Sequence, residues 1–234
     1  MIYRRTFDAA SGDSLARLSR WIRPGTSVLE LGAAAGYFTE WLKEQGTSVD
    51  VVDIDPEAGR ATERFARRVV IADLDNDGWE AALSEGGAPP RYDFIVCADV
   101  LEHLHDPRGA LLKLRGRLTP EGRLICSIPN IAFYTVRLKV LLGEFEYTDG
   151  GIMDRTHLRF FTHQTARALL EEAGFRVSRE EVSHYLSVGP APLSRALNRL
   201  VERGSFGTAV HRVCLAFPGV FGYQFVTESV PSAP

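Results

Sequence analysis

The chain has 234 residues, of which 45% are hydrophobic and 24% charged, as in a globular protein with one large core. The net charge of −3 and the pI of about 6.1 give no electrostatic reason to expect nucleic acid or a membrane as partner. The three cysteines lie far apart without Cys/His spacing, and no signal-peptide or transmembrane stretch is found. We therefore expect no metal site, no disulfide framework and a cytoplasmic location.

Seven apolar segments rich in β-branched residues predict the strands of one sheet. They are 27–31, 48–53, 68–72, 92–98, 122–128, 175–182 and 223–230. Helical patterns lie between them at 37–45, 56–67, 107–117, 163–173 and 192–216. Strands that alternate with helices predict an α/β fold, with a mostly parallel sheet and helices on both of its faces.

Local signals fix several element ends. Asp-Pro at 55–56 and at 106–107 offers a capping carboxylate followed by proline at the first helical position. Gly46 and Gly174 are expected to end helices in the left-handed conformation. The DNDG segment at 75–78 reads as a turn, with its aspartates as turn formers.

Residues 130–162 form an unusually long connection between the fifth strand and the next helix. An open α/β sheet places its ligand at the carboxyl ends of its strands, and this connection begins there. We therefore expect it to form part of a binding site. It closes with the segment DRTHLRFFT, residues 154–162, which is rich in ionisable side chains.

The segment VLELGAAAGYFTEWL, residues 28–42, predicts a buried strand, a turn of small residues and an amphipathic helix. Small residues let the backbone approach a ligand closely, as in any nucleotide-binding α/β fold. A dinucleotide site needs G-x-G-x-x-G, which is absent here. Glu30 would also repel a pyrophosphate, so an NAD-dependent oxidoreductase is an alternative that the loop disfavours.

Acidic residues recur where the predicted strands end. Asp53, Asp73 and Asp99 follow the second, third and fourth strands, and Glu102 lies one turn further on. Such a ring suits a cofactor with a sulfonium, an ammonium and a ribose diol better than one with phosphates.

From about residue 15 to 182 the chain resembles the class I S-adenosylmethionine-dependent methyltransferases. The matching segments are LELGAAAG, VVDIDPEA, IADLD, YDFIVCADVLEHLHDP and SIPN. The segment SIPN ends the fifth strand, a position at which it resembles the small-molecule O-methyltransferases of ubiquinone biosynthesis and of bacterial sugar or natural-product tailoring. One departure is Ala34, where the family usually has a glycine. The resemblance implies a Rossmann-like, doubly wound sheet of seven strands in the order 3-2-1-4-5-7-6, with strand 7 antiparallel.

The resemblance also assigns residues to the cofactor S-adenosylmethionine. They are Glu30, Gly32, Gly36, Asp53, Asp73, Leu74 and Asp99. Glu30 and the Gly32 backbone would hold the methionyl ammonium, and Asp53 the ribose hydroxyls. Asp73 would accept a hydrogen bond from the exocyclic amine of adenine, and Leu74 would pack against the adenine ring. Asp99 would lie near the methyl group.

Transfer of a methyl group to a hydroxyl requires an acceptor held in line and benefits from a base. Two histidines are predicted as catalytic. His103 follows Asp99 by four residues, so both can face one cleft. His157 follows Asp154 by three, a spacing at which the carboxylate can fix the ring tautomer.

The segment DRTHLRFFT has two interpretations. In one, Asp154 pairs with Arg155 or Arg159 and the phenylalanines pack beneath to anchor the connection. In the other, His157 is the base, and an arginine grips an anionic group of the substrate. We expect the segment to serve both purposes: the phenylalanines anchor the connection, and the histidine and an arginine face the substrate. The residues predicted to bind the substrate are Arg155, Arg159 and Asn130, the last residue of SIPN.

These observations predict one methyltransferase domain over residues 1–234, with an insertion at 130–162 and a helical cover at 190–220. The expected reaction is O-methylation of a small-molecule hydroxyl, on a sugar or natural-product intermediate. Methylation of nitrogen or of a macromolecule is an alternative, although ADVL stands where base and amide N-methyltransferases usually carry D/N-P-P-Y. A further alternative is a domain that binds the cofactor and does not catalyse methyl transfer. The oligomeric state stays open.

Overall fold

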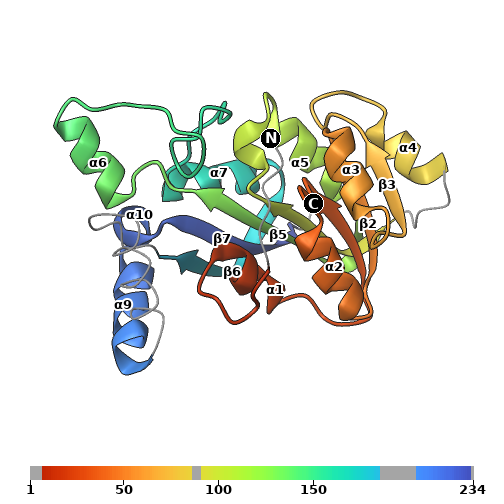
Figure 1. Ribbon diagram of the computed structural model, residues 1–234, viewed down its shortest axis with the longest axis horizontal. Helices are drawn as coiled ribbons and strands as arrows, with labels where there is room; N and C mark the ends of the chain where they lie inside the picture. Colours follow the sequence, from red (N-terminus) through yellow and green to blue (C-terminus); the bar gives the residue numbers. More distant parts are fainter. Residues whose placement is uncertain (1–6, 86–90, 185–203, 233–234) are drawn as a thin grey trace.

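Seven strands form one mixed sheet in the order β3-β2-β1-β4-β5-β7-β6 (Figure 1). The computed structural model describes residues 7–85, 91–184 and 204–232. The strands are β1 Ser27–Leu31, β2 Ser48–Asp53, β3 Arg68–Ile71, β4 Tyr92–Ala98, β5 Leu118–Pro129, β6 Phe175–Ser183 and β7 Gln224–Pro231. β7 runs antiparallel to both β5 and β6, whereas the other pairings are parallel. The predicted order and the antiparallel last strand are confirmed.

The described helices are α1 Ser14–Ser19, α2 Tyr37–Glu44, α3 Pro56–Thr62, α4 Trp79–Glu85, α5 Pro107–Arg115, α6 Tyr134–Leu141, α7 His163–Glu172, α9 Gly204–Ala216 and α10 Pro218–Phe221. Four short helices, α1, α4, α6 and α10, are not among those predicted from the sequence. The first part of the helix predicted at 192–216 lies outside the described residues. None of the helices in the described ranges is long and apolar enough to cross a membrane.

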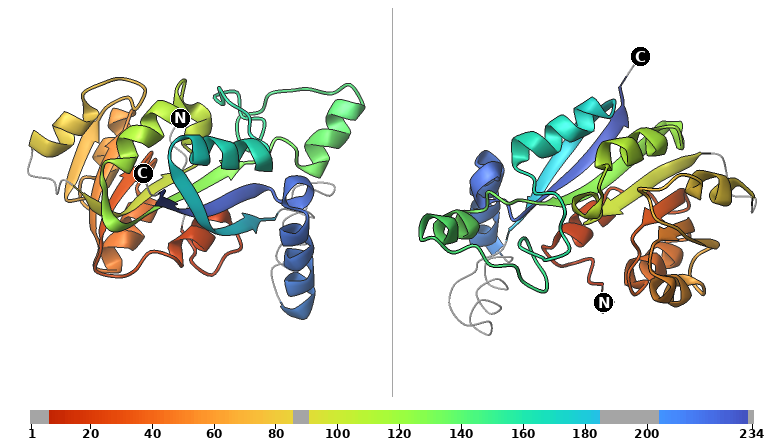
Figure 2. Two further views of the ribbon diagram at one scale, coloured as in Figure 1. Left: turned by 180° about the vertical axis from the view of Figure 1, so that it is seen from behind. Right: turned by 90° about the horizontal axis from the view of Figure 1, so that it is seen from above.

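The side chains of the central strands alternate between two cores, one on each face of the sheet. Val28, for example, packs in the core that holds residues of α1 and α2, whereas Leu29 packs in the core that holds residues of α4, α5 and α7. Figure 2 shows the sheet between these two helical layers. Successive side chains of a strand point to opposite faces, so strands buried on both sides read as continuous apolar runs.

The predicted helix starts are confirmed. Asp55 accepts a hydrogen bond from the backbone N–H of Glu57 at 2.8 Å, and Asp106 accepts one from Gly109 at 2.9 Å. Thr162 caps α7 in a reciprocal capping box. A capping side chain satisfies one of the four N–H groups that the first helical turn leaves without partners.

Asp75 does more than form a turn. Its carboxylate accepts from the backbone N–H groups of His105 and Asp106, both at 2.8 Å. These bonds tie the segment after β3 to the segment after β4. The DNDG turn is therefore a tertiary contact across the site edge of the sheet, which its sequence alone did not indicate.

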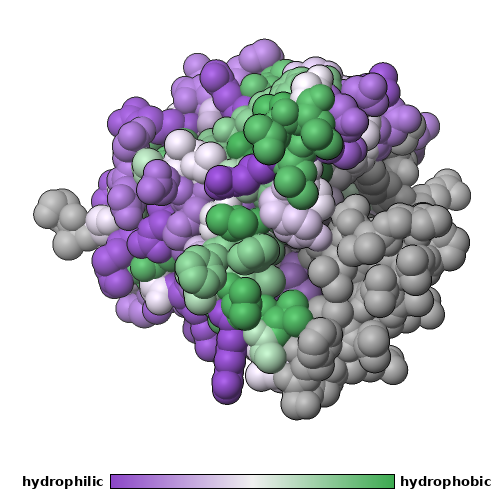
Figure 3. Space-filling model, turned by 90° about the vertical axis from the view of Figure 1, so that its left-hand side faces the viewer, coloured by the Kyte–Doolittle hydropathy of each residue, from purple (hydrophilic) through white to green (hydrophobic). Residues whose placement is uncertain are grey.

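The long connection is anchored at both ends and exposed in the middle. Phe161 is buried in the main core, and its carbonyl accepts from the N–H of Ile131 at 2.9 Å, so its predicted anchoring role is confirmed. α6 instead exposes apolar side chains, among them Leu138 and Leu141. Figure 3 shows apolar surface (green) on the end of the molecule where α6 lies.

A buried arginine joins α1 to the far edge of the sheet. Arg17 donates to Glu181 of β6 at 3.0 Å, and its guanidinium nitrogens lie 3.3 Å from Nε2 of His211 and 3.4 Å from Nδ1 of His184. Burial, and then the Arg17 charge and His211, lower the pKa of His184 to about 4. Both imidazoles accept from the arginine and are therefore neutral here.

This arrangement predicts a loss of stability in mild acid. The pKa of His184 is about 4 in the folded protein, below the ordinary value of 6.5, so the unfolded chain binds the proton more readily. The contribution is fully present above about pH 6.5 and is lost as the pH falls toward about 4. We expect the thermal midpoint of the parent protein to fall more steeply between about pH 7.5 and about pH 5 than that of His184→Gln. Parallel pH dependence in the two proteins would contradict this.

Candidate functional site

Three connected hollows lie at the carboxyl ends of β1, β2 and β4. The large cavity has a volume of about 380 Å³, the second cavity about 300 Å³ and the small cavity about 40 Å³. Gly32 and Asp99 line all three. The site therefore lies where the parallel strands end, as expected for an open α/β sheet.

The loop after β1 owes its shape to residues in the left-handed conformation. Gly32 has φ +68°, and a Cβ there would meet Val100 at 2.9 Å. Ala34 has φ +49°, so the alanine adopts a conformation that favours glycine, and its N–H donates to Asp53 at 3.2 Å. Gly36 has φ +77° and is absent from the lining of the three cavities; a Cβ there would meet Thr62. Gly36 therefore serves the close approach of two helices.

Glu30 is buried beneath the glycine loop and lines the small cavity. Its carboxylate accepts from the hydroxyl of Thr39 at 2.7 Å. Burial raises the pKa of Glu30 to about 7, an effect that the Thr39 hydrogen bond opposes and the nearby Asp53 reinforces. A positively charged ligand group in this cavity would restore the carboxylate to its ionised form.

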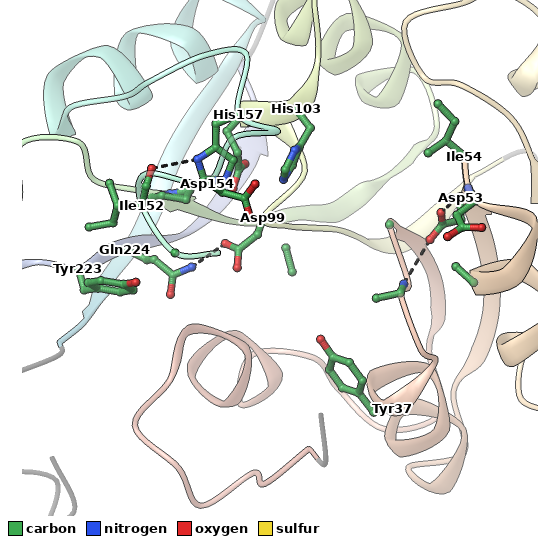
Figure 4. A pocket seen from close by; sticks show the side chains of 18 residues that line it. Tyr37, Asp53, Ile54, Asp99, His103, Ile152, Asp154, His157, Tyr223 and Gln224 are labelled. Carbon is green, nitrogen blue, oxygen red and sulfur yellow. Dashed lines mark hydrogen bonds and ion pairs between the residues drawn. The ribbon is translucent and has the colours of Figure 1, made fainter. Parts of the chain in front are cut away.

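Asp53 lies where the large and second cavities meet. Its two oxygens accept from the N–H groups of Asp55 at 2.9 Å and Ala34 at 3.2 Å, which fixes the carboxylate at the end of β2 (Figure 4). Burial raises its pKa despite these bonds. Each oxygen has a further lone pair for a ligand donor, as a bidentate grip on a diol requires.

Asp73 and Leu74 both line the second cavity. Asp73 accepts from the N–H of Asp75 at 2.9 Å and from the side-chain amide of Asn76 at 3.0 Å. Leu74 is buried and presents an apolar wall. The second cavity thus combines an oriented carboxylate with an apolar surface, a lining that suits a flat heteroaromatic ring.

Asp99 has φ +55°, a conformation that is uncommon for a residue with a side chain. Its Oδ1 accepts from the hydroxyl of Ser127 at 2.6 Å. The same oxygen accepts from the amide of Gln224 at 2.7 Å (Figure 4). Strands β5 and β7 thereby hold the carboxylate between the three cavities. A backbone outlier retained at such a junction indicates a functional position.

The charge of the cavities is one-sided. No lysine or arginine is among the described residues that line them, whereas carboxylates recur. The acidic residues of the large cavity are Asp53, Asp55, Asp99, Glu102 and Asp154. Such a lining fits the ammonium, sulfonium and ribose hydroxyls of S-adenosylmethionine, and it disfavours phosphates.

Both predicted catalytic histidines line the large cavity, and His103 also lines the second. Nδ1 of His103 lies 3.1 Å from the Thr156 carbonyl oxygen, and Nδ1 of His157 lies 3.1 Å from that of Ile152. Each ring nitrogen that faces a carbonyl must carry the proton, which leaves the Nε2 lone pair as the acceptor. A backbone carbonyl thus takes the tautomer-fixing role that the sequence analysis gave to Asp154.

The two rings lie edge to face, with centroids 4.8 Å apart. The side chain of His157 is 6% exposed. Burial, and then the neighbouring His103, lower the pKa of His157. A neutral imidazole with a free Nε2 lone pair is the form that a general base requires.

Glu102 lies behind these rings and lines the same cavity. It is 1% exposed, and in the described structure neither carboxylate oxygen has a hydrogen-bond partner. Oε1 lies 3.9 Å from Nε2 of His157. Burial, and then Asp99, raise the pKa of Glu102 well above its ordinary value. A buried polar group without a partner costs about 1–3 kcal/mol, so it requires an explanation.

Asn130 is fully buried and is absent from the lining of the three cavities. Its amide donates to the Gly222 carbonyl at 2.8 Å, and its oxygen accepts from the N–H of Ala132 at 3.0 Å. These bonds join the end of β5 to the segment before β7. The structure thus places Asn130 where it shapes the wall of the site without facing the cavity.

The arginines of DRTHLRFFT also lie outside the cavity lining. Arg155 pairs with Asp149 at 2.7 Å on the surface, and Arg159 donates to the His105 carbonyl at 2.7 Å. Neither makes the ion pair with Asp154 that the anchoring interpretation predicts. Their guanidiniums brace the connection through other partners, and this placement gives no support to a grip on an anionic substrate.

The large cavity also contains residues that the sequence analysis did not single out. They are Tyr37, Ile152, Tyr223 and Gln224, among others. The insertion supplies Gly151, Ile152, Asp154 and His157, whereas no described residue of the predicted cover at 190–220 lines the cavity. Gln224 opens β7, and nothing in an apolar closing strand signals that its first residues reach the site.

Comparison with known proteins agrees with this geometry. A family model described as a methyltransferase domain matches residues 3–180. The ubiquinone biosynthesis O-methyltransferase of Schizosaccharomyces pombe, a mitochondrial protein, is 27% identical over 120 residues, 51% of this chain and 44% of the relative. That of Xylella fastidiosa strain 9a5c is 31% identical over 122 residues, 52% of this chain and 49% of the relative. The aligned part spans about half of the length of these two relatives.

Solved structures share the fold. A methyltransferase of Archaeoglobus fulgidus that depends on S-adenosylmethionine has a TM-score of 0.60 at 19% identity, covering 93% of this chain and 92% of that one. The 1,6-didemethyltoxoflavin-N1-methyltransferase of Burkholderia thailandensis, solved with S-adenosylhomocysteine, has a TM-score of 0.56 at 20% identity, covering 96% and 79%. With the family match over most of its length, the chain belongs to the methyltransferase domain family and contains a class I S-adenosylmethionine-dependent methyltransferase domain.

Proposed function

We propose that the protein O-methylates a small molecule, such as a sugar or natural-product intermediate, that binds in the large cavity. The observation that carries this proposal is the meeting of Asp99, His103 and His157 around one space of about 380 Å³. That volume is within the range of small-ligand sites, roughly 300–1,000 Å³. The curated relatives that act in ubiquinone biosynthesis, named as O-methyltransferases, support oxygen as the methylated atom.

The cofactor would lie across the junction of the cavities. Asp53 is placed to accept from the ribose hydroxyls, and Asp73 and Leu74 to receive the adenine in the second cavity. Glu30, through the small cavity, would balance the methionyl ammonium. S-adenosylmethionine, when bound, supplies a methyl group on a positively charged sulfur.

The base would be one of the two histidines. His103 is better placed than His157, because it lines both the large and the second cavity and so lies beside Asp99 at their junction. Figure 4 shows its ring directed into the open space above Asp99. His103 would take the hydroxyl proton through Nε2, while its Nδ1–H continues to donate to the Thr156 carbonyl.

The experiment that tests this function is incubation with S-adenosylmethionine and panels of hydroxylated sugars, amino sugars, sugar nucleotides and phenols. Formation of S-adenosylhomocysteine identifies an acceptor, and carbon-13 NMR of the product identifies the methylated atom. An O-methyl product supports the proposal. An N-methyl product, as the name of the Burkholderia thailandensis enzyme suggests for that protein, or a product only on a macromolecule would replace it.

Asp53→Asn is expected to weaken S-adenosylhomocysteine binding by roughly 10- to 100-fold, because a charge-assisted grip on two hydroxyls is worth about 1.5–3 kcal/mol. Calorimetric titration of the purified protein measures the dissociation constant. Asp77→Asn is the matched control, since Asp77 is exposed, pairs with Lys113 and lies outside the three cavities. Equal affinity of Asp53→Asn and the parent protein would refute the assigned role.

His103→Ala is expected to lower kcat by about 10²- to 10⁴-fold and to leave S-adenosylhomocysteine affinity nearly unchanged. His163→Gln serves as control, because His163 pairs with Glu180 outside the cavities.

If His157 is the base instead, His157→Ala causes the larger loss of kcat. The acid limb of kcat then lies below pH 6.5, since burial lowers the pKa of His157 and keeps the ring neutral into mild acid. Full activity of both variants would exclude a histidine base.

A further inference from the structure

Glu102 is a buried carboxyl that faces a ligand cavity without a hydrogen-bond partner. It is 1% exposed, and the partner that a buried acid usually finds in its own chain is missing at both oxygens in the described structure. Its backbone is occupied, since the Glu102 carbonyl accepts from the N–H groups of Leu158 and Arg159. The side chain is therefore held in place while both carboxyl oxygens are left for a group that enters the cavity.

The two histidines beside Glu102 offer hydrogen-bond acceptors. Nδ1 of His103 and Nδ1 of His157 already face carbonyls, so each neutral ring presents a lone pair at Nε2. A carboxylate oxygen of Glu102 and one ring nitrogen of each histidine all lie within 4.8 Å of one another, and Nε2 of His157 lies 3.9 Å from Oε1 of Glu102. A ligand that satisfies all of them must bring several hydrogen-bond donors.

The spacing distinguishes between a metal ion and an organic cation. Ligands held about 2.1 Å from a tetrahedral zinc ion lie about 3.4 Å apart. Acceptors around one ammonium nitrogen, at about 2.9 Å each, lie up to about 4.7 Å apart. The separation of 3.9 Å between Oε1 of Glu102 and Nε2 of His157 exceeds the zinc spacing and lies within the ammonium range. An ammonium group fits this distance without contraction of the cluster.

The charge of the lining leads to the same class of ligand. The described residues that line the large cavity include five carboxylates and neither lysine nor arginine. Arg155 and Arg159 were predicted to bind an anionic group of the substrate. Instead, Arg155 pairs with Asp149, and Arg159 donates to the His105 carbonyl. An anionic acceptor would be repelled here, whereas a cation would pair with a buried charge in a medium of low dielectric constant.

We propose that the acceptor is a hydroxyamine whose ammonium binds Glu102 and His157 and whose neighbouring hydroxyl lies at His103. A 1,2-amino alcohol, as in an amino sugar, presents the two groups at the required separation. Glu102 is then the residue that selects the acceptor, and His103 stays available to take the hydroxyl proton. This assignment rests on the proposed function and adds the substrate class to it.

Ligand binding should change the protonation of Glu102. Burial raises its pKa in the free protein, together with the facing groups Asp99, Cys97 and Asp154, and His103 and His157 lie beside it. An ammonium seated against the carboxyl favours its ionised form, so binding should be accompanied by proton release. Titration calorimetry in two buffers of different ionisation enthalpy measures this release directly.

The test uses matched probes on the protein saturated with S-adenosylhomocysteine. The first set is trans-2-aminocyclohexanol, cyclohexane-1,2-diol and 2-hydroxycyclohexanecarboxylate, and the second is glucosamine, glucose and glucuronate. We expect the amine of at least one set to bind at least roughly tenfold more tightly than its neutral and acidic partners. Glu102→Gln should remove both that preference and the proton release. Glu121→Gln, an exposed change of the same charge on β5, should keep them.

Three results would overturn the proposal. One is that no amine binds, or that neutral and acidic probes bind equally well. Another is that Glu102→Gln lowers the thermal midpoint and leaves the amine preference intact, because Glu102 would then be structural. The third is that Mg²⁺ or Zn²⁺ binds the parent protein and not Glu102→Gln, while amines fail to compete. Methylation of the amine nitrogen would refute the O-methylation proposed above and leave the amine site standing, so the two failures are distinguishable.

Discussion

The parallel pairing of β1 with β2 and β4 is the constraint on which the site depends. Because parallel strands share one direction, their carboxyl ends meet at one edge, and the loops that leave them must turn there. Gly32, Asp53 and Asp99 reach that edge from three different strands. The backbone accommodates the crowding by left-handed turns at Gly32, Ala34 and Asp99. The strain is stored where the ligand is expected, and the two apolar cores on either side of the sheet hold it in place.

A second constraint comes from the antiparallel β7, which lies between β5 and β6. Its first residue, Gln224, donates to Asp99, and Ser127 of β5 donates to the same oxygen. A residue near the end of the chain thus orients a carboxylate that follows β4. The long connection contributes the opposite wall, because the carbonyls of Ile152 and Thr156 set the tautomers of both histidines. The site is therefore oriented largely by backbone carbonyls and by strands distant in sequence.

The electrostatic character of the site follows from what these walls exclude. The buried carboxylates of Glu30, Asp53 and Glu102 all have raised pKa values, because burial removes water without supplying a cation. Retaining three such groups at one edge of a sheet is unfavourable for the ligand-free fold. It becomes favourable once positively charged groups or hydroxyl donors enter, so the stability given up by the free protein is recovered as binding selectivity.

The sequence by itself determined the strand segments, the capped helix starts and the acidic strand ends, because each depends on local patterns: apolar runs, Asp-Pro pairs and side chains next to the last strand residue. With the family resemblance, it also led to the strand order. Only the tertiary structure decided the rest. It turned Gly36 and Asn130 toward packing, directed Arg155 and Arg159 away from the cavity, and brought Glu102 into contact distance of His157 across more than fifty residues of chain. Side-chain direction and burial depend on distant strands and loops, which local patterns do not encode.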